Sequence, residues 1–302
     1  MSRIHDALKR AEQERATSTG THVEPAYEQA DVDNEVAREG MPSLQPSPAT
    51  VMTTMASGFS YEALLARCPQ TEWKPDPRTM LFFQEDDSRV GTEEFRTLRS
   101  RLYQIREKMQ LKRLLVTSAL PKEGKSFVAA NLAQVLVRQH GRRVLIIDGD
   151  LRNPGMHRHL GASQTPGLAE YLLGESDEFA ALQRGPMENL FFMPAGRSGG
   201  SAPELLSNGR LKLLLQRVEP LFDWIILDSS PVIPVSDATL VAGVCDGILM
   251  VVRSNSTPSD MARRAREEFP DKLLVGVVLN GTSTGDVARS KYYYGEAVNS
   301  QV

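Results

Sequence analysis

The sequence predicts an α/β domain in which helices cover both faces of a mostly parallel β-sheet. Between about residues 80 and 285, short apolar runs alternate with segments of helical periodicity. The apolar runs are nearly continuous rather than alternately apolar and polar, which is typical of strands covered on both faces. Helical segments between successive strands favour right-handed crossovers, and such connections join parallel strands.

The segments outside this pattern differ in composition. Residues 1–16 have the pattern of a short helix, and residues 17–84 have the acidic, proline-containing composition of a flexible linker. One stretch of that linker, "FSYEALLARC" (59–68), is compatible with a short amphipathic helix. The domain itself is expected at residues 85–285, followed by a tail at 286–302. We expect the N-terminal extension and the tail to be disordered.

The expected domain opens with the helical pattern "TEEFRTLRSRLYQI" and then alternates strands with helices. Strands are expected at residues 113–119, 143–148, 189–195, 224–228, 247–252 and 273–280.

Composition and hydropathy exclude several classes of protein. The net charge of −3 gives no support for nucleic-acid binding. No apolar run reaches the roughly 18–20 residues that cross a bilayer, and the first residues lack the apolar stretch of a signal peptide. We therefore expect a cytoplasmic protein.

A phosphate-binding loop follows the first expected strand. The stretch "ALPKEGKS" (119–126) ends in Gly124, Lys125 and Ser126, and an amphipathic helical pattern comes directly after it. Gly124 lets backbone amides turn toward phosphate oxygens, Lys125 would neutralise the β- and γ-phosphates, and the Ser126 hydroxyl would reach Mg²⁺. The sequence thus predicts a P-loop NTPase fold with nucleotide-binding residues Pro121, Lys122, Glu123, Gly124, Lys125, Ser126 and Phe127.

Aspartates stand at the ends of two further strands. Asp148 and Asp150 follow the run "VLIID", and Asp228 ends "WIILD". Ligands of parallel sheets bind at the carboxyl edge of the strands, where a carboxylate can hold Mg²⁺ or accept a proton. The alternative is that these aspartates only cap the helices or turns that follow. Their number beside a phosphate loop favours the metal–nucleotide role.

From about residue 85 onward, the chain resembles the bacterial tyrosine kinases that accompany exopolysaccharide synthesis, in their stand-alone cytoplasmic form. The motifs that carry the resemblance are "ALPKEGKS", the D-x-D-x-R motif of "VLIIDGDLR" and the Walker B motif "IILDSSPV". The resemblance implies ATP and Mg²⁺ as cofactors. It also implies catalytic residues Lys125, Asp148, Asp150 and Asp228, and metal ligands Ser126, Asp148, Asp150 and Asp228.

Individual roles within this site follow from the same resemblance. Asp148, or else Asp150, is the candidate acceptor of the tyrosine proton. Asn280 corresponds to a residue that contacts adenine in related ATPases, and an amide can pair with the edge of that base. A local turn formed by Asn280 and Gly281 is the alternative.

The resemblance also implies how the kinase regulates itself. Its C-terminal tyrosines, here Tyr292, Tyr293 and Tyr294, are phosphorylated by a neighbouring subunit. The strip Glu93, Arg96 and Arg99 corresponds to the contact between subunits of a ring, whereas without the resemblance it would be a solvated helix face. For the tyrosines, the alternative is a hydrophobic docking patch on the domain's own surface. The implied partner is the cytoplasmic segment of a membrane polysaccharide chain-length or co-polymerase protein, which would recruit the kinase to the inner face of the membrane.

The main rival is the partition-type ATPases, which share the fold. Many of them carry an additional lysine early in the phosphate loop, and Leu120 occupies that position here. This departure favours the kinases. The alternative function is an ATP-driven switch that positions or assembles a membrane apparatus without kinase activity.

Overall fold

The computed structural model describes residues 59–83, 90–197 and 199–283. The expected helix at 1–16, the first part of the expected linker and the tail with Tyr292, Tyr293 and Tyr294 lie outside the described residues. Within these ranges, no helix combines the length and the apolar character that a membrane crossing needs.

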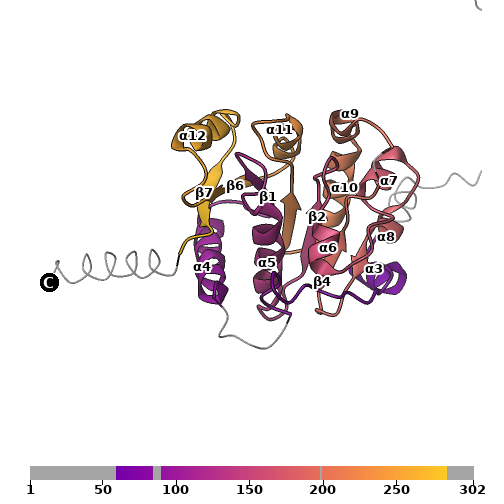
Figure 1. The fold of residues 1–302 in the computed structure, drawn as a ribbon. Coiled ribbons are helices and arrows are strands. Elements are labelled where there is room, and N and C mark those ends of the chain that lie inside the picture. Colours follow the sequence, from indigo (N-terminus) through magenta and orange to yellow (C-terminus); the bar gives the residue numbers. More distant parts are fainter. Residues whose placement is uncertain (1–58, 84–89, 198, 284–302) are drawn as a thin grey trace, which may run out of the picture. The chain divides into compact units, whose positions relative to one another are not determined.

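A seven-stranded sheet forms the centre of the domain (Figure 1). Its strands are β1 (Arg113–Ser118), β2 (Val144–Asp148), β3 (Gln183–Arg184), β4 (Leu190–Met193), β5 (Trp224–Asp228), β6 (Gly247–Arg253) and β7 (Leu274–Asn280). The spatial order is β3-β4-β2-β5-β1-β6-β7, and every neighbouring pair is parallel except β3 with β4. All strands expected from the sequence are present, and the mostly parallel sheet is confirmed. The short antiparallel β3 was not predicted.

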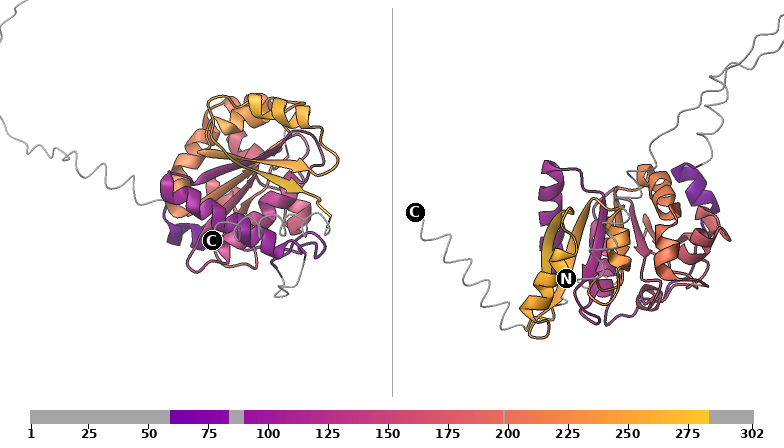
Figure 2. Two further views of the ribbon diagram at one scale, coloured as in Figure 1. Left: turned by 90° about the vertical axis from the view of Figure 1, so that its left-hand side faces the viewer. Right: turned by 90° about the horizontal axis from the view of Figure 1, so that it is seen from above.

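Helices cover both faces of the sheet, as predicted (Figure 2). One face is covered by α4 (Thr92–Lys108), α5 (Lys125–Val137) and α6 (Met156–Leu160). The other carries α7 (Leu168–Leu173), α9 (Ala202–Ser207), α10 (Arg210–Val218), α11 (Asp237–Ala242) and α12 (Ser259–Glu267). The short α3 (Tyr61–Arg67) packs with α8 (Glu178–Ala181).

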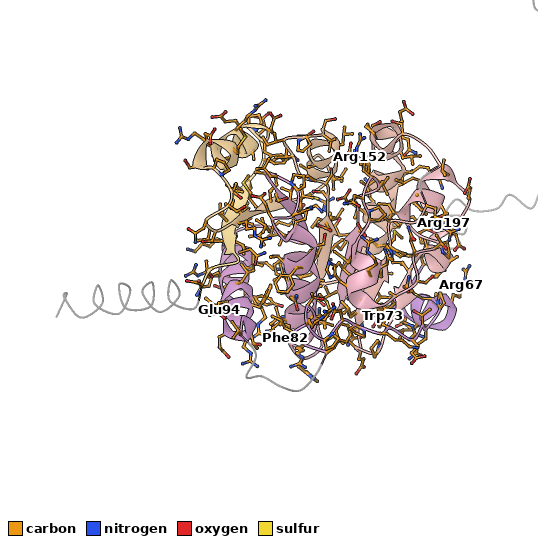
Figure 3. All side chains as sticks on the ribbon, in the orientation of Figure 1. Arg67, Trp73, Phe82, Glu94, Arg152 and Arg197 are labelled. Carbon is orange, nitrogen blue, oxygen red and sulfur yellow. The ribbon has the colours of Figure 1, made fainter. Side chains whose placement is uncertain are left out.

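The expected linker is wrong for residues 59–83, because this segment is part of the packed domain. Helix α3 forms as its sequence suggests, with the Ser60 side chain capping it. Residues 71–83, here called the strap, then cross the α4–α5–α6 face of the sheet. Their apolar side chains are buried, among them Trp73, Met80, Leu81 and Phe82; Figure 3 labels Trp73 and Phe82.

Two buried amides of α5 hold the strap in place. Asn131 Oδ1 accepts a hydrogen bond from Leu81 N at 2.8 Å, and Asn131 Nδ2 donates to Thr79 O at 2.8 Å. Gln134 Oε1 accepts from Phe82 N at 3.2 Å. Since both amide side chains are fully buried, the strap satisfies polar groups that would otherwise be buried without partners. This explains how α5 can carry polar residues and still be buried on all sides.

The strap also fixes the end of α6. Lys74 N donates to Gly161 O at 3.1 Å, and Asp76 N donates to His159 O at 3.0 Å. The approach is so close that a Cβ on Gly161 would lie 2.0 Å from Lys74 O. The strap therefore contacts both α5, which follows the phosphate loop, and α6, which follows the aspartates of β2.

We predict that Asn131→Ala lowers the free energy of unfolding by about 1–3 kcal/mol, because it leaves the Leu81 amide and the Thr79 carbonyl without a partner. Urea unfolding of the full chain measures the change. Arg78→Ala is the matched control in the strap, since the Arg78 side chain is 88% exposed and its ion pair with Asp76 lies at the surface. Equal stability of the two variants would contradict the role given to Asn131.

Candidate active site

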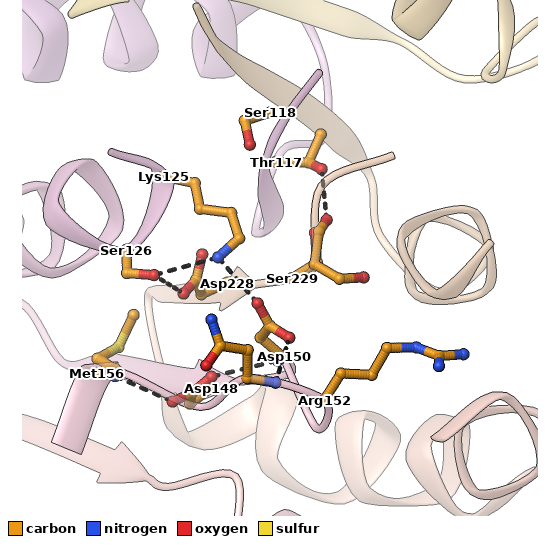
Figure 4. Close-up of polar contacts among 12 residues, drawn as sticks. Thr117, Ser118, Lys125, Ser126, Asp148, Asp150, Arg152, Met156, Asp228 and Ser229 are labelled. Carbon is orange, nitrogen blue, oxygen red and sulfur yellow. Dashed lines mark hydrogen bonds and ion pairs between the residues drawn. The ribbon is translucent and has the colours of Figure 1, made fainter. Parts of the chain in front are cut away.

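The strand order brings the predicted site residues to one edge of the sheet. Strands β2, β5 and β1 are adjacent, and the register of β2 with β5 pairs Asp148 directly with Asp228. The phosphate loop leaves the carboxyl end of β1 on the other side of β5 and leads into α5. The carboxylates of two strands and the first turn of α5 therefore meet at the same place (Figure 4).

The phosphate loop is folded tightly around Gly124. This glycine has φ +95°, a left-handed conformation that side chains rarely adopt, and a Cβ there would lie 2.1 Å from Asn280 Nδ2. Asn280 Nδ2 in turn donates to Glu123 O at 2.8 Å. Asn280, predicted as an adenine contact, thus also supports the loop.

Lys125 forms an ion pair with Asp150, with 2.9 Å between Nζ and Oδ2. Both side chains are largely buried. Burial alone would lower the pKa of Lys125, but the negative charges of Asp228, Asp150 and Asp148 raise it. Lys125 is thus held protonated, as neutralisation of phosphate requires.

Asp228 lies against the first turn of α5. Ser126 Oγ donates to Asp228 Oδ2 at 2.5 Å, while the buried Oδ1 finds no hydrogen-bond partner among the described residues. Burial is the largest influence and raises the pKa of Asp228 to about 6, although the charge of Lys125 and the Ser126 hydrogen bond lower it. An acceptor oxygen without a partner beside a serine hydroxyl suits a cation ligand.

Asp148 is fully buried at the end of β2. Its Oδ1 accepts from Asp150 N and its Oδ2 from Met156 N, both at 3.2 Å. Burial and the neighbouring charge of Asp228 raise the pKa of Asp148 to about 7, against the lowering effect of the Met156 amide. A carboxylate with this pKa can accept a proton near neutral pH.

A magnesium nucleotide fits these residues. Such a ligand would use Asp228 Oδ1, which has no hydrogen-bond partner in the described part of the chain, and the close-packed Gly124 loop. Mg²⁺ is commonly held by one or two carboxylates together with phosphate oxygens and water, so Ser126 and Asp228 would hold it here. Within the described ranges, no three or more His, Cys, Asp or Glu side chains form a ready-made metal site. Ser126, Asp148, Asp150 and Asp228 all stay predictions as metal ligands.

The remaining predicted residues are distributed around this centre. Pro121 and Lys122 are exposed at the loop surface, whereas the Phe127 ring packs edge-on against Phe95 of α4 with 5.9 Å between centroids. Phe127 stays a prediction as a nucleotide contact. Arg152 of the D-x-D-x-R motif forms a two-point ion pair with the buried Asp237, at 2.6 and 3.1 Å.

The strip Glu93, Arg96 and Arg99 lies on α4, which packs against α5. Arg96 forms an ion pair with Glu93 on the same helix, and Arg99 Nη1 donates to Val135 O at 3.2 Å. Arg99 therefore also ties α4 to α5.

Sequence reasoning missed two groups of residues that support the site. Asn131 and Gln134 hold the strap on α5, and the signal for them was a pair of polar residues within an otherwise apolar helix. Arg253, which ends β6, and Thr257, which follows this strand, contact the phosphate loop, and no local sequence pattern identifies them.

The chain is similar to known kinases, although no protein-family model matches it. It is 34% identical to the tyrosine-protein kinase YwqD of Bacillus subtilis (strain 168) over 206 residues, which cover 68% of this chain and 86% of YwqD. It is 34% identical over 181 residues to ExoP of Rhizobium meliloti (strain 1021), a succinoglycan biosynthesis transport protein; the match covers 58% of this chain but 23% of ExoP. Among solved structures, the kinase domain of the Escherichia coli tyrosine kinase ETK has a TM-score of 0.57 and 29% identity, covering 64% of this chain and 77% of that one.

We predict that Asp228→Asn stabilises the protein at pH 8 in the absence of nucleotide and Mg²⁺. The pKa of Asp228 is about 6 in the folded protein and near 4 when unfolded, so ionisation costs stability as the pH rises through this range. The variant should be more stable than the wild type by about 1–3 kcal/mol at pH 8, with a much smaller difference at pH 4.5.

Urea unfolding at both pH values measures this difference. Asp260→Asn is the control, because it removes the same charge at an exposed position. If the stability difference between Asp228→Asn and the wild type does not increase from pH 4.5 to pH 8, the charge of the buried Asp228 carboxylate does not destabilise the fold.

Proposed function

The chain belongs to the bacterial tyrosine kinases and is therefore a protein-tyrosine kinase, and from this premise we propose that it phosphorylates Tyr292, Tyr293 and Tyr294 of a neighbouring subunit with MgATP. The observation that carries this proposal is the meeting of Lys125, Ser126 and the aspartates at the carboxyl edge of the sheet. Kinase membership favours this function over the ATP-driven switch without kinase activity.

The proposed reaction is an in-line phosphoryl transfer. The phenol oxygen of a tail tyrosine forms a bond to the γ-phosphorus, the bond to the bridging oxygen breaks, and ADP leaves. A phenol has a pKa near 10, so its proton must pass to a carboxylate. Asp148 is our candidate because its raised pKa suits this task, and Asp150 is the alternative.

Lys125 changes partner in this scheme. Its ammonium contacts Asp150 in the structure, and the phosphates would compete for the same charge. A move of Lys125 to the phosphates would free Asp150 beside the reacting group. When bound, Mg²⁺ would supply a positive charge that stabilises the phosphate oxygens.

The position of β7 supports a role for the tail. Asn280 ends this strand and donates a hydrogen bond to the phosphate loop, so the last strand ends beside the proposed nucleotide site. Between Asn280 and Tyr292 the chain can span at most about 40 Å when extended. That length allows the tyrosines to reach the site of an adjacent subunit.

We also propose a role in exopolysaccharide polymerisation or export. ExoP, a biosynthesis transport protein, contains a segment similar to this chain within a much longer protein. This supports a partnership in which the kinase is a separate chain, recruited to the inner face of the cell membrane by the cytoplasmic segment of a polysaccharide co-polymerase.

A mixing experiment tests transfer between subunits. Lys125→Met keeps the tail tyrosines but should lose at least about 100-fold in activity, because the phosphate charge is no longer neutralised. The triple variant Tyr292→Phe, Tyr293→Phe and Tyr294→Phe keeps the active site but lacks acceptors. Neither alone should become phosphorylated, whereas the mixture with MgATP should carry phosphotyrosine on the Lys125→Met chain. No phosphotyrosine in the mixture, with normal labelling of the wild type, would refute transfer between subunits.

A charge reversal tests the proposed ring contact. Arg96→Glu places a second negative charge one helical turn from Glu93 and should weaken association, which light scattering would detect as a smaller mass. Tail phosphorylation should fall by about tenfold or more with it. Arg101→Glu changes the charge equally at an exposed position of the same helix. Identical masses for both variants would argue against the strip as a subunit contact.

A further inference from the structure

A group of side-chain hydrogen bonds connects the phosphate loop to the ends of β6 and β7. We call the four residues that supply these side chains the brace: Glu123, Arg253, Thr257 and Asn280. Glu123 belongs to the loop, Arg253 ends β6, Thr257 follows it, and Asn280 ends β7. These strands are neighbours at one edge of the sheet. The brace therefore joins segments that are far apart in the sequence.

Glu123 is the centre of the brace. Its residue surface is only 3% exposed, and its carboxylate accepts hydrogen bonds from Leu120 N at 2.7 Å and from Thr257 Oγ1. Glu123 therefore closes the loop on itself through Leu120 and fastens it to the segment after β6 through Thr257.

Two further side chains of the brace donate hydrogen bonds to backbone carbonyls of the loop. Arg253 Nη1 donates to Lys122 O at 3.0 Å, and Asn280 Nδ2 donates to Glu123 O. Lys122 has φ +66°, a left-handed conformation that is unfavourable for a residue with a side chain. Such a conformation persists when its surroundings fix it, and here the surrounding contacts are those of the brace.

A buried carboxylate beside a site for phosphate has an electrostatic cost unless it is fully hydrogen-bonded. Thr257 is the side chain whose hydroxyl satisfies Glu123 from outside the loop, and Arg253 N donates to Thr257 Oγ1 at 3.2 Å, which orients the hydroxyl. Loss of the Thr257 hydroxyl would leave Glu123 one donor short and free to move toward the loop interior, where phosphate would bind.

We propose that Thr257 is a positioning residue for nucleotide binding, acting through Glu123 to hold the phosphate loop in the shape that receives phosphate. This inference rests on the proposed use of MgATP, but it does not depend on which tyrosine is phosphorylated. Loop amides would contact phosphate in both the ground state and the transition state. Their misplacement therefore weakens binding more than it slows the chemical step.

Thr257→Val tests the proposal in the full chain, because it removes the hydroxyl and keeps the shape. The dissociation constant of MgATP, measured by calorimetry, should rise about tenfold. The KM for ATP should rise similarly with an added tyrosine copolymer as acceptor, while kcat stays within about twofold. Thr257→Ser, which retains the hydroxyl, should restore wild-type binding.

Two further measurements separate this role from a general structural one. Thr71→Val removes a threonine hydrogen bond to Gln183 at the opposite edge of the sheet and should leave MgATP affinity unchanged. In a Glu123→Ala background, Thr257→Val should cause no additional loss of affinity, because the two residues act as one unit.

The measurements distinguish failure of the Thr257 role from failure of the proposed kinase function. If the wild type binds no MgATP, the proposed use of ATP fails. If the wild type binds it and Thr257→Val binds equally well, or if Thr257→Ser loses as much affinity as Thr257→Val, the positioning role of Thr257 is overturned.

Discussion

The site depends on charges that are buried together at one edge of the sheet. Asp148, Asp150 and Asp228 are almost inaccessible to solvent, and water cannot stabilise them there. Lys125, the Ser126 hydroxyl and backbone amides after β2 replace that solvent. This arrangement exists only because β2, β5 and β1 are adjacent and in register. The same arrangement raises the pKa of Asp148 and of Asp228, and among the described residues it leaves Asp228 Oδ1 without a hydrogen-bond partner.

Most of this could be predicted from the sequence, because the information is local. Each of the main strands is a continuous apolar run, and the loop and both acidic motifs follow directly after such runs. By contrast, β3 consists only of Gln183 and Arg184, which carry no apolar pattern. Thr257 was not identifiable because its partner Glu123 is 134 residues away, and their contact depends on the pairing of β1 with β6.

The strap shows a different limit of composition-based reasoning. Its average hydrophobicity is low, but its few large apolar residues, such as Trp73 and Phe82, are almost wholly buried. Two side-chain amides on α5 satisfy its backbone, which a count of charges and prolines does not reveal. The domain therefore begins well before residue 85, and the strap supports both helices that follow the catalytic strands.

The strap also constrains the order in which the domain folds. It leaves the ribosome before α5, yet its anchors on that helix lie 50 and 52 residues further along the chain. During synthesis, the aromatic residues of the strap therefore stay exposed until α5, on which they pack, has been synthesised. Docking uses the surface of the formed α5, so the strap is expected to join after the folding nucleus has formed. Weakening it would then mainly accelerate unfolding, which makes this short segment a determinant of how long the folded kinase survives.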